Sequence, residues 1–360
     1  MKVIFRVDAS LQMGTGHVTR CLTLAQVLKE NGADVKFICR KHEGNLIDKI
    51  RSNGFVVHEL ELFREADVDT SLVHSYWLGT TQQQDANDCI DILKAEELDW
   101  LIVDHYALDE QWQKRLKPYY KKLMVIDDLA DRKHQCDILL DQTFGRQQED
   151  YSALTPKGCN LLLGSQYALL RPEFAKWRIY SLKRRKKSKF NQILINVGGV
   201  DFENFTEFFL NALNGMPQMN GKSVMVIMGS KSPHINRIKV LSEILSFKVE
   251  VLVDVGNMAE ILANTDLVFG ALGVSTWERC LLGVPSVVIS TAKNQEFTAK
   301  ILHDLGAISF LGKSSIVKAE DVKSIINMCE ADSGLLSNFS RKSMKIMKDW
   351  NIKYLVGNFF

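Results

Sequence analysis

The sequence predicts an α/β protein with two domains, each built on a parallel β-sheet that helices cover on both faces. The chain has 360 residues, which exceeds the usual size of one hydrophobic core. Short apolar and β-branched runs alternate with longer segments of helical periodicity, which is the rhythm of βαβ units. This alternation stops near residues 178–190 and then starts again, so two such domains follow one another.

The first domain is expected over residues 1–182, with strands in the runs "KVIFRVDA", "DVKFICR", "VVHELE", "DWLIVDHY", "KLMVIDDL" and "CDILLDQ". The second is expected over residues 190–335, with strands in "ILINVGG", "KSVMVIMG", "VEVLVDV", "TDLVFGALG", "PSVVIS" and "GAISFLG". Open parallel sheets bind ligands at the carboxyl ends of their strands. We therefore expect the ligand in a cleft where the two domains face each other.

Two segments fall outside this pattern. Residues 183–189 are strongly basic, and we interpret them as a solvated linker or surface helix end, with contact to a membrane surface or a phosphate as the alternative. Residues 336–360 predict one amphipathic helix with aromatic residues. We expect that helix to return and pack on the first domain.

Composition excludes several classes of protein. The 45 basic and 43 acidic residues are mixed along the chain, so the net charge of +2 disfavours nucleic acid as a partner. The seven cysteines form no C-x-x-C pair, which argues against a disulfide framework or structural zinc and favours reduced thiols in a cytoplasm. With no signal peptide before the first strand and no apolar run near the ~20 residues that span a bilayer, we expect no membrane insertion.

The segment "GTGHVTR", residues 14–20, joins the first predicted strand to a helix. Gly14 and Gly16 let the backbone turn sharply and approach a ligand. The segment is not G-x-G-x-x-G, because residue 19 is threonine, so a nicotinamide cofactor is disfavoured and no cofactor is expected. His17 lies at the helix start, where a neutral imidazole is favoured and can accept a proton from water. The alternative is a helix-start histidine bonded to backbone.

A second glycine turn, Gly198–Gly199 in "INVGGVDFEN", ends the first strand of the second domain. Its backbone amides are suited to wrap a diphosphate. We also assign Gly229 and Met258 to the binding of UDP. After a later strand, "STAKNQ" carries Asn294 and Gln295, whose amides suit sugar hydroxyls or N-acetyl groups.

The segment "FGALGVSTWERCLLGVPSVV", residues 269–288, is more specific. After Gly273, Ser275 and Thr276 open a helix whose start can receive a diphosphate. Glu278 then lies one turn in, where it can accept hydrogen bonds from ribose hydroxyls. The structural alternative is a capping box formed by Ser275 and Glu278.

These motifs, with "DHYALD", "VIDDLADRKHQCDILLDQT" and "GSQYALLRPEF", closely resemble the PseG family of UDP-2,4-diacetamido-2,4,6-trideoxy-β-L-altropyranose hydrolases of pseudaminic acid biosynthesis, over roughly residues 2–310. The resemblance implies a MurG-like GT-B fold with UDP on the second domain. It also implies transfer of the sugar to water without a metal. The family's catalytic histidine matches His17, and its Tyr and Asn contacts to the sugar or water match Tyr106 and Asn294.

The chemistry that we predict is attack on C1 by a water that His17 deprotonates, with inversion and with amides stabilising UDP. A GT-B glycosyltransferase with a carbohydrate or lipid acceptor and a non-catalytic nucleotide-sugar sensor remain alternatives. We interpret Asp104, Asp127 and Asp128 as caps or loop-ordering groups, with a metal site as their rival. Cys21 and Cys280 are expected to serve packing, although each follows a glycine loop.

Overall fold

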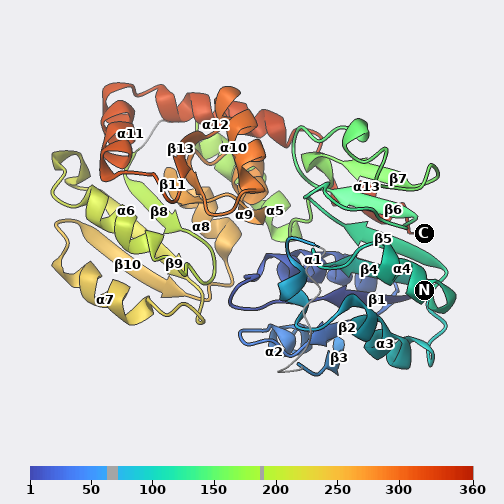
Figure 1. The fold of residues 1–360 in the computed structure, drawn as a ribbon. Helices are drawn as coiled ribbons and strands as arrows, with labels where there is room; N and C mark the ends of the chain where they lie inside the picture. The colour runs from blue at the N-terminus through green and yellow to red at the C-terminus, as the bar shows by residue number, and fades with distance from the viewer. Residues whose placement is uncertain (63–71, 187–189, 360) are drawn as a thin grey trace. The chain divides into compact units, whose positions relative to one another are not determined.

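A computed structural model describes residues 1–62, 72–186 and 190–359 of the chain (Figure 1). Contacts divide it into two compact units. The first comprises Met1–Leu169 and Asn351–Phe360, and the second comprises Leu170–Trp350. Each unit contains one sheet whose strand pairings are all parallel, as the alternating sequence pattern predicts.

The first unit has a seven-stranded sheet of order β3-β2-β1-β4-β5-β6-β7. Its strands are β1 (Lys2–Val7), β2 (Asp34–Arg40), β3 (Val56–Leu60), β4 (Trp100–Asp104), β5 (Lys122–Ile126), β6 (Ile138–Asp141) and β7 (Asn160–Leu163). Its helices are α1 (Gly16–Glu30), α2 (Ile47–Ser52), α3 (Gln82–Leu93), α4 (Glu110–Leu116) and α13 (Ile352–Val356).

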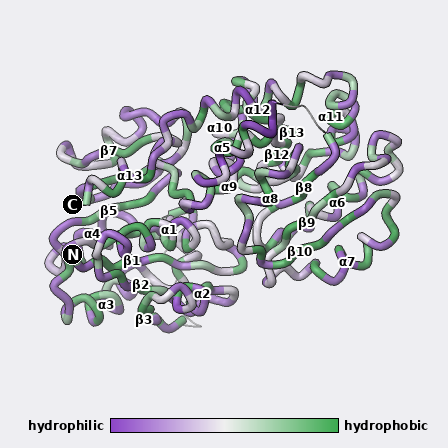
Figure 2. Tube along the Cα trace, turned by 180° about the vertical axis from the view of Figure 1, so that it is seen from behind, coloured by the Kyte–Doolittle hydropathy of each residue, from purple (hydrophilic) through white to green (hydrophobic). Residues whose placement is uncertain are grey.

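Both faces of this sheet are buried. Successive residues of a strand point to opposite faces, and β1 shows the result. Val3 and Phe5 enter one hydrophobic cluster with α1, whereas Ile4 enters another with α3 and α4. Figure 2 shows hydrophobic residues frequent along the strands and alternating with polar ones along the helices. Helices on both faces leave only the edges of the sheet for a ligand.

The second unit has a six-stranded sheet of order β10-β9-β8-β11-β12-β13. Its strands are β8 (Gln192–Asn196), β9 (Ser223–Met228), β10 (Lys248–Val253), β11 (Leu267–Ala271), β12 (Ser286–Ser290) and β13 (Ser309–Lys313). Its helices are α5 (Pro172–Arg184), α6 (Phe205–Leu213), α7 (Ile235–Ile244), α8 (Met258–Asn264), α9 (Val274–Leu281), α10 (Gln295–Asp304), α11 (Ala319–Ala331) and α12 (Leu335–Ile346).

The C-terminal segment differs from its prediction, because residues 336–360 form two helices and not one. The break falls where Asn351 caps α13, its side chain accepting a hydrogen bond from the Lys353 N–H at 3.0 Å. The helix α12 belongs to the second unit, whereas α13 returns to the first. There Leu355 and Phe359 join the hydrophobic core, and the Phe359 ring lies 4.8 Å from that of Trp100.

The described part of the basic segment forms the end of α5, which is the helix-end form of its prediction, but Arg185 is not solvated. Arg185 is buried and its guanidinium donates to the carbonyls of Thr265 and Leu262, each at 2.8 Å. Arg184 pairs with Asp266 at 2.6 Å. These arginines hold the end of α5 on the second unit and are not a solvated linker. Residues 187–189 of the segment lie outside the described residues.

Candidate active site

Strand order locates one binding edge in each unit. In the first sheet the chain leaves β1 toward β2 and then returns to β4 on the other side of β1. In the second it leaves β8 toward β9 and returns to β11. The carboxyl ends of strands at such a reversal are where open α/β sheets bind ligands. The segments that follow β1, β4, β8 and β11 contain most of the predicted site residues.

The loop after β1 depends on one left-handed residue. Gly14 has φ of +73° and donates its N–H to the Ser10 carbonyl at 2.9 Å, which closes a tight turn. Gly16 then begins α1. A Cβ added at Gly16 would meet no atom within 4 Å, so open space lies beside it. His17 follows in the first turn of the helix, 8% exposed.

Asp104, the last residue of β4, holds the His17 ring. Its Oδ1 lies 2.5 Å from His17 Nδ1. Arg20 donates to the same carboxylate from Nε at 2.6 Å and from Nη2 at 2.7 Å. Burial by itself raises the pKa of Asp104, but the charges of Arg20 and His17 outweigh it and hold that pKa well below its usual range.

An ionised Asp104 fixes the imidazole tautomer. A carboxylate only accepts hydrogen bonds, so Nδ1 of His17 must be the donor. In the neutral ring Nε2 then carries the lone pair, and no residue within the described ranges hydrogen-bonds to it. Arg20 Nη2 also lies 3.3 Å from Nδ1. His17 is therefore arranged to accept a proton at Nε2.

Aromatic side chains surround the histidine. The Tyr106 ring lies edge-to-face with His17 at 4.6 Å, and Trp77 stacks on Tyr106 at 5.5 Å. His74 lies 4.7 Å from the Trp77 ring. The Tyr106 hydroxyl donates to Asp128, which also accepts from Arg20 Nη1 at 2.9 Å. Burial raises the pKa of Tyr106 well above its usual value, so it remains a phenol and can act as a donor or a ring contact.

The three aspartates of the predicted cap-or-metal group all have protein partners. Asp127 accepts from the Ala130 N–H at 3.0 Å and from the Tyr151 hydroxyl at 2.9 Å, so it orders a loop. Asp104 and Asp128 hold His17, Arg20 and Tyr106 in place. Within the described ranges, no cluster of three or more His, Cys, Asp or Glu side chains is placed to bind a metal ion.

The two cysteines after the glycine loops are buried thiols. Cys21 donates to Asp104 Oδ2 at 3.4 Å, and burial raises its pKa well above the usual value. Burial also raises the pKa of Cys280 to about 12. Neither is a thiolate near neutral pH, in agreement with a packing role.

In the second unit, two glycine loops press their backbones together. Gly198 has φ of +109°, and the Gly199 carbonyl accepts from the Gly229 N–H at 2.9 Å. A Cβ at Gly229 would lie 2.4 Å from that carbonyl oxygen, so no side chain fits there. Met258 begins α8 after β10 and is half-buried. Because all strands are parallel, these segments share one edge of the sheet.

The helix after β11 starts one residue before its prediction. Gly273 is the cap residue, and its N–H donates to Thr276 Oγ1 at 3.2 Å. The Ser275–Glu278 capping box, the structural alternative for this segment, is not formed. The Glu278 carboxylate instead lies 3.8 Å from Arg171 Nη2. Burial raises the pKa of Glu278. This glutamate thus pairs with Arg171, a half-buried cation, and not with the start of its own helix.

Arg279, which the sequence analysis did not single out, lies beneath the start of α9 and is 2% exposed. Its guanidinium donates to the carbonyl of Ala271 at 3.0 Å and to the hydroxyls of Thr276 and Ser275 at 3.1 and 3.2 Å. Across the described part of the chain, no carboxylate lies within ion-pair distance of it. Burial lowers its pKa to about 10, so it stays cationic at neutral pH. A buried, unneutralised charge favours an anion nearby.

The remaining predicted residues follow β12. Gln295 begins α10, and its Oε1 accepts from the Thr291 N–H at 2.9 Å, which orders the loop. Asn294 is exposed beside it. The structure therefore gathers Gly14, Gly16, His17 and Tyr106 at one edge of the first sheet. The other predicted residues are gathered along the carboxyl edge of the second.

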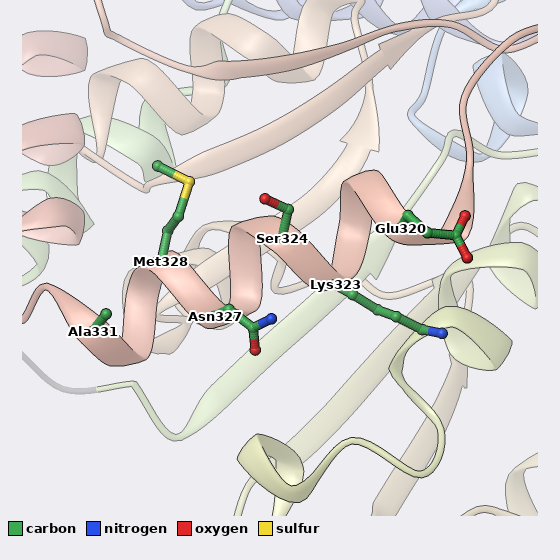
Figure 3. Close-up of a pocket in the computed structure, with 6 residues that line it drawn as sticks. All are labelled: Glu320, Lys323, Ser324, Asn327, Met328 and Ala331. Atoms are coloured by element: carbon green, nitrogen blue, oxygen red, sulfur yellow. The ribbon is translucent and has the colours of Figure 1, made fainter.

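A hollow of about 450 Å³ lies against α11 (Figure 3). Its lining residues all come from that helix: Glu320, Lys323, Ser324, Asn327, Met328 and Ala331. None of them is a predicted site residue.

Signals for two of the missed residues were present in the sequence. Arg20 lies three positions after His17, which places both on one face of a helix. Arg279 directly follows Glu278 in "STWERC". His74 and Trp77 come from a short aromatic segment outside every motif, and only the tertiary fold brings them to Tyr106.

Comparison with known proteins agrees with the resemblance drawn from the motifs. No known family profile matches the chain. A UDP-2,4-diacetamido-2,4,6-trideoxy-β-L-altropyranose hydrolase of Campylobacter jejuni is 28% identical over 307 residues, or 85% of this chain and 97% of that protein. The spore coat polysaccharide biosynthesis protein SpsG of Bacillus subtilis is 24% identical over 89% of this chain and 86% of its own length.

Among solved structures, MurG of Acinetobacter baumannii matches with a TM-score of 0.67 over 99% of both chains, at 14% identity. That likeness concerns the fold alone. In the described part of the chain, no helix has the length and apolar character that crossing a membrane requires. The chain thus has the GT-B fold, with two Rossmann-like units, and over most of its length it is similar in sequence to the Campylobacter altropyranose hydrolase.

Proposed function

We propose that this protein hydrolyses a UDP-linked 2,4-diacetamido-2,4,6-trideoxyhexose at C1, with His17 as the general base. The observation that carries the proposal is the contact of His17 Nδ1 with Asp104 at 2.5 Å, because it leaves Nε2 as the proton acceptor. The sequence similarity to the Campylobacter hydrolase supplies the substrate class. The residues that orient His17 are buried, so the base is held in one tautomer before substrate binds.

In the proposed reaction, water gives a proton to His17 Nε2 while its oxygen attacks C1 of the sugar. The bond between C1 and the diphosphate oxygen breaks, and its electron pair leaves with UDP. Attack from the face opposite UDP inverts C1. Asp104 accepts from Nδ1–H throughout and stabilises the imidazolium that forms. General-base assistance of this kind contributes about 10²- to 10⁴-fold in rate.

The second unit is proposed to bind UDP. Its candidate residues are Gly198, Gly199, Gly229, Met258, Gly273, Ser275, Thr276 and Glu278. Backbone N–H groups at the start of an eight-residue helix and in glycine loops favour a diphosphate. Arg279 places a cation beneath the same helix start. Its charge is proposed to stabilise the diphosphate without a metal. Glu278, oriented by Arg171, is proposed to accept from ribose hydroxyls.

The sugar is proposed to contact the loop of Gly14 and Gly16 and the ring and hydroxyl of Tyr106. Asn294 is exposed after β12, where its amide is free to meet an acetamido group. Gln295 uses its carbonyl within the loop, which leaves its NH₂ as a donor.

Incubation of the purified protein with the UDP-sugar in ¹⁸O-water, with a chelator and without an acceptor, tests this function. The proposal predicts UDP release with the label on the sugar. Label on UDP would mean attack at phosphorus. UDP release that requires an added carbohydrate or lipid would mean a glycosyltransferase, and tight binding without release would mean a sensor.

A further inference from the structure

Two free cysteines of the first unit face each other. The Sγ atoms of Cys136 and Cys159 are 3.6 Å apart. Cys136 lies two residues before β6 and Cys159 directly before β7, and these strands are neighbours with Ile138 paired to Asn160. Both thiols therefore lie at the amino edge of the sheet, whereas His17 follows the carboxyl end of β1. This pair takes no part in the proposed reaction.

The pair combines one reachable thiol with one shielded partner. Cys159 is half-buried, whereas the other six cysteines, which all lie in the described ranges, are buried. Cys136 is 6% exposed. The hydrogen bond from Cys136 lowers the pKa of the Cys159 thiol, and the same bond raises the pKa of Cys136. Cys159 therefore has the features of an attacking thiol, and Cys136 those of a resolving one.

We infer that Cys136 and Cys159 form a modification site that a two-electron oxidant, such as a hydroperoxide, closes to an intrachain disulfide. The Cys159 thiolate attacks the peroxide oxygen, the O–O bond breaks and hydroxide leaves, which gives a sulfenic acid. Cys136 then loses its proton and attacks Cys159 Sγ, and the S–O bond breaks with loss of water. The sulfur atoms must approach from 3.6 Å to about 2.05 Å for the bond to form.

The disulfide would enclose a segment that supports the candidate site from behind. Between the two cysteines, Tyr151 donates to Asp127 at 2.9 Å, and Arg146 Nη2 donates to the Asp128 carbonyl at 2.9 Å. Asp128 in turn holds Tyr106 and Arg20. Closing the loop restricts the unfolded chain, so oxidation should raise the unfolding temperature by on the order of a few degrees.

Treatment of the reduced protein with one equivalent of hydrogen peroxide tests the inference. We expect a mass loss of about 2 Da and the loss of two of the seven free thiols. Tryptic digestion without reductant should yield peptides 134–146 and 158–176 linked to each other. Dithiothreitol should restore both thiols and the lower unfolding temperature.

Cys159→Ser and Cys136→Ser should each abolish the link, and Cys329→Ser, a buried cysteine of the second unit, should leave it intact. If one serine variant fails to fold, the other and the peptide map of the unmodified protein still decide. A mass gain of about 16 or 32 Da on Cys159 with Cys136 still reduced would overturn the inference. So would thiol loss at other cysteines at the same rate. Neither outcome bears on hydrolysis of the UDP-sugar.

Discussion

Two neighbours, Asp104 and Arg20, fix the orientation and the tautomer of the His17 ring. Asp104 accepts a hydrogen bond from Nδ1–H of His17, and the charge of Arg20 keeps that carboxylate ionised. The same carboxylate also stabilises the imidazolium once a proton arrives. The carboxylate is thus a positioning group for the proposed base, and its removal should change the rate more than it changes binding.

Asp104→Asn keeps the shape of the side chain and removes its charge. We expect kcat to fall by about 10²- to 10⁴-fold while the affinity for UDP stays nearly unchanged. Asp91→Asn, at an exposed position of α3, is the matched control. An unchanged kcat in Asp104→Asn would rule out this role for Asp104.

Arg279 is predicted to act on the diphosphate through charge. Arg279→Gln should weaken UDP binding by roughly tenfold or more and leave uridine binding nearly unaltered, whereas Arg279→Lys should retain part of the UDP affinity. Titration calorimetry with UDP and with uridine measures how far each affinity falls. Equal losses for UDP and uridine would show that the arginine only shapes the loop.

The role of a residue was predictable where it lies in a local sequence motif. It was not predictable where residues far apart in the sequence meet only in the fold. The glycine loop before a helix identified His17 as a base candidate. Asp104 was seen only as a strand-end acid, because 87 residues separate it from its partner. The pairing of β1 with β4 brings them together, and no local pattern encodes that pairing.

At the scale of elements, the glycine loops after β8 and β9 determine how closely two backbones approach. The sequence predicted the strands that precede them, since each is an apolar run followed by a turn. It missed β7, the strand at the edge of the first sheet, and it merged α12 with α13. Tertiary contacts of Leu355 and Phe359 fix that last helix on the first unit, which periodicity cannot reveal.

Gly229→Ala tests the close approach of these loops. The added Cβ would lie 2.4 Å from the Gly199 carbonyl oxygen, so one loop must shift. We expect a loss of about 1–3 kcal/mol in stability and weaker UDP binding. Gly158→Ala, where a Cβ would meet nothing within 4 Å, should change neither. Calorimetric unfolding measures the stability, and titration with UDP measures the affinity. Wild-type stability and affinity in Gly229→Ala would contradict the tight packing.

For the whole molecule, buried aspartates determine the response to pH. The pKa values of Asp8, Asp85, Asp104 and Asp127 are lowered, because arginine charges outweigh burial. Their stabilisation is present above the usual aspartate pKa and is lost as the pH falls below it. Burial raises the pKa of Asp141 to about 6, so the folded state binds its proton more tightly. Its contribution therefore falls as the pH rises from about 4 to 6.

Asp141→Asn should remove the loss of stability that Asp141 causes as the pH rises. Relative to the parent protein, the stability of the variant should rise between pH 4 and 7 by roughly 1–3 kcal/mol. Thermal unfolding of both proteins across this range provides the comparison. Parallel curves would show that Asp141 titrates normally in the fold.

The most direct test of His17 as the base is the single-turnover rate of UDP release by His17→Asn, measured beside its affinity for UDP. Loss of the base predicts a rate about 10²- to 10⁴-fold lower with UDP affinity within twofold of the parent. A rate equal to that of the unaltered protein would contradict the proposed role of this histidine.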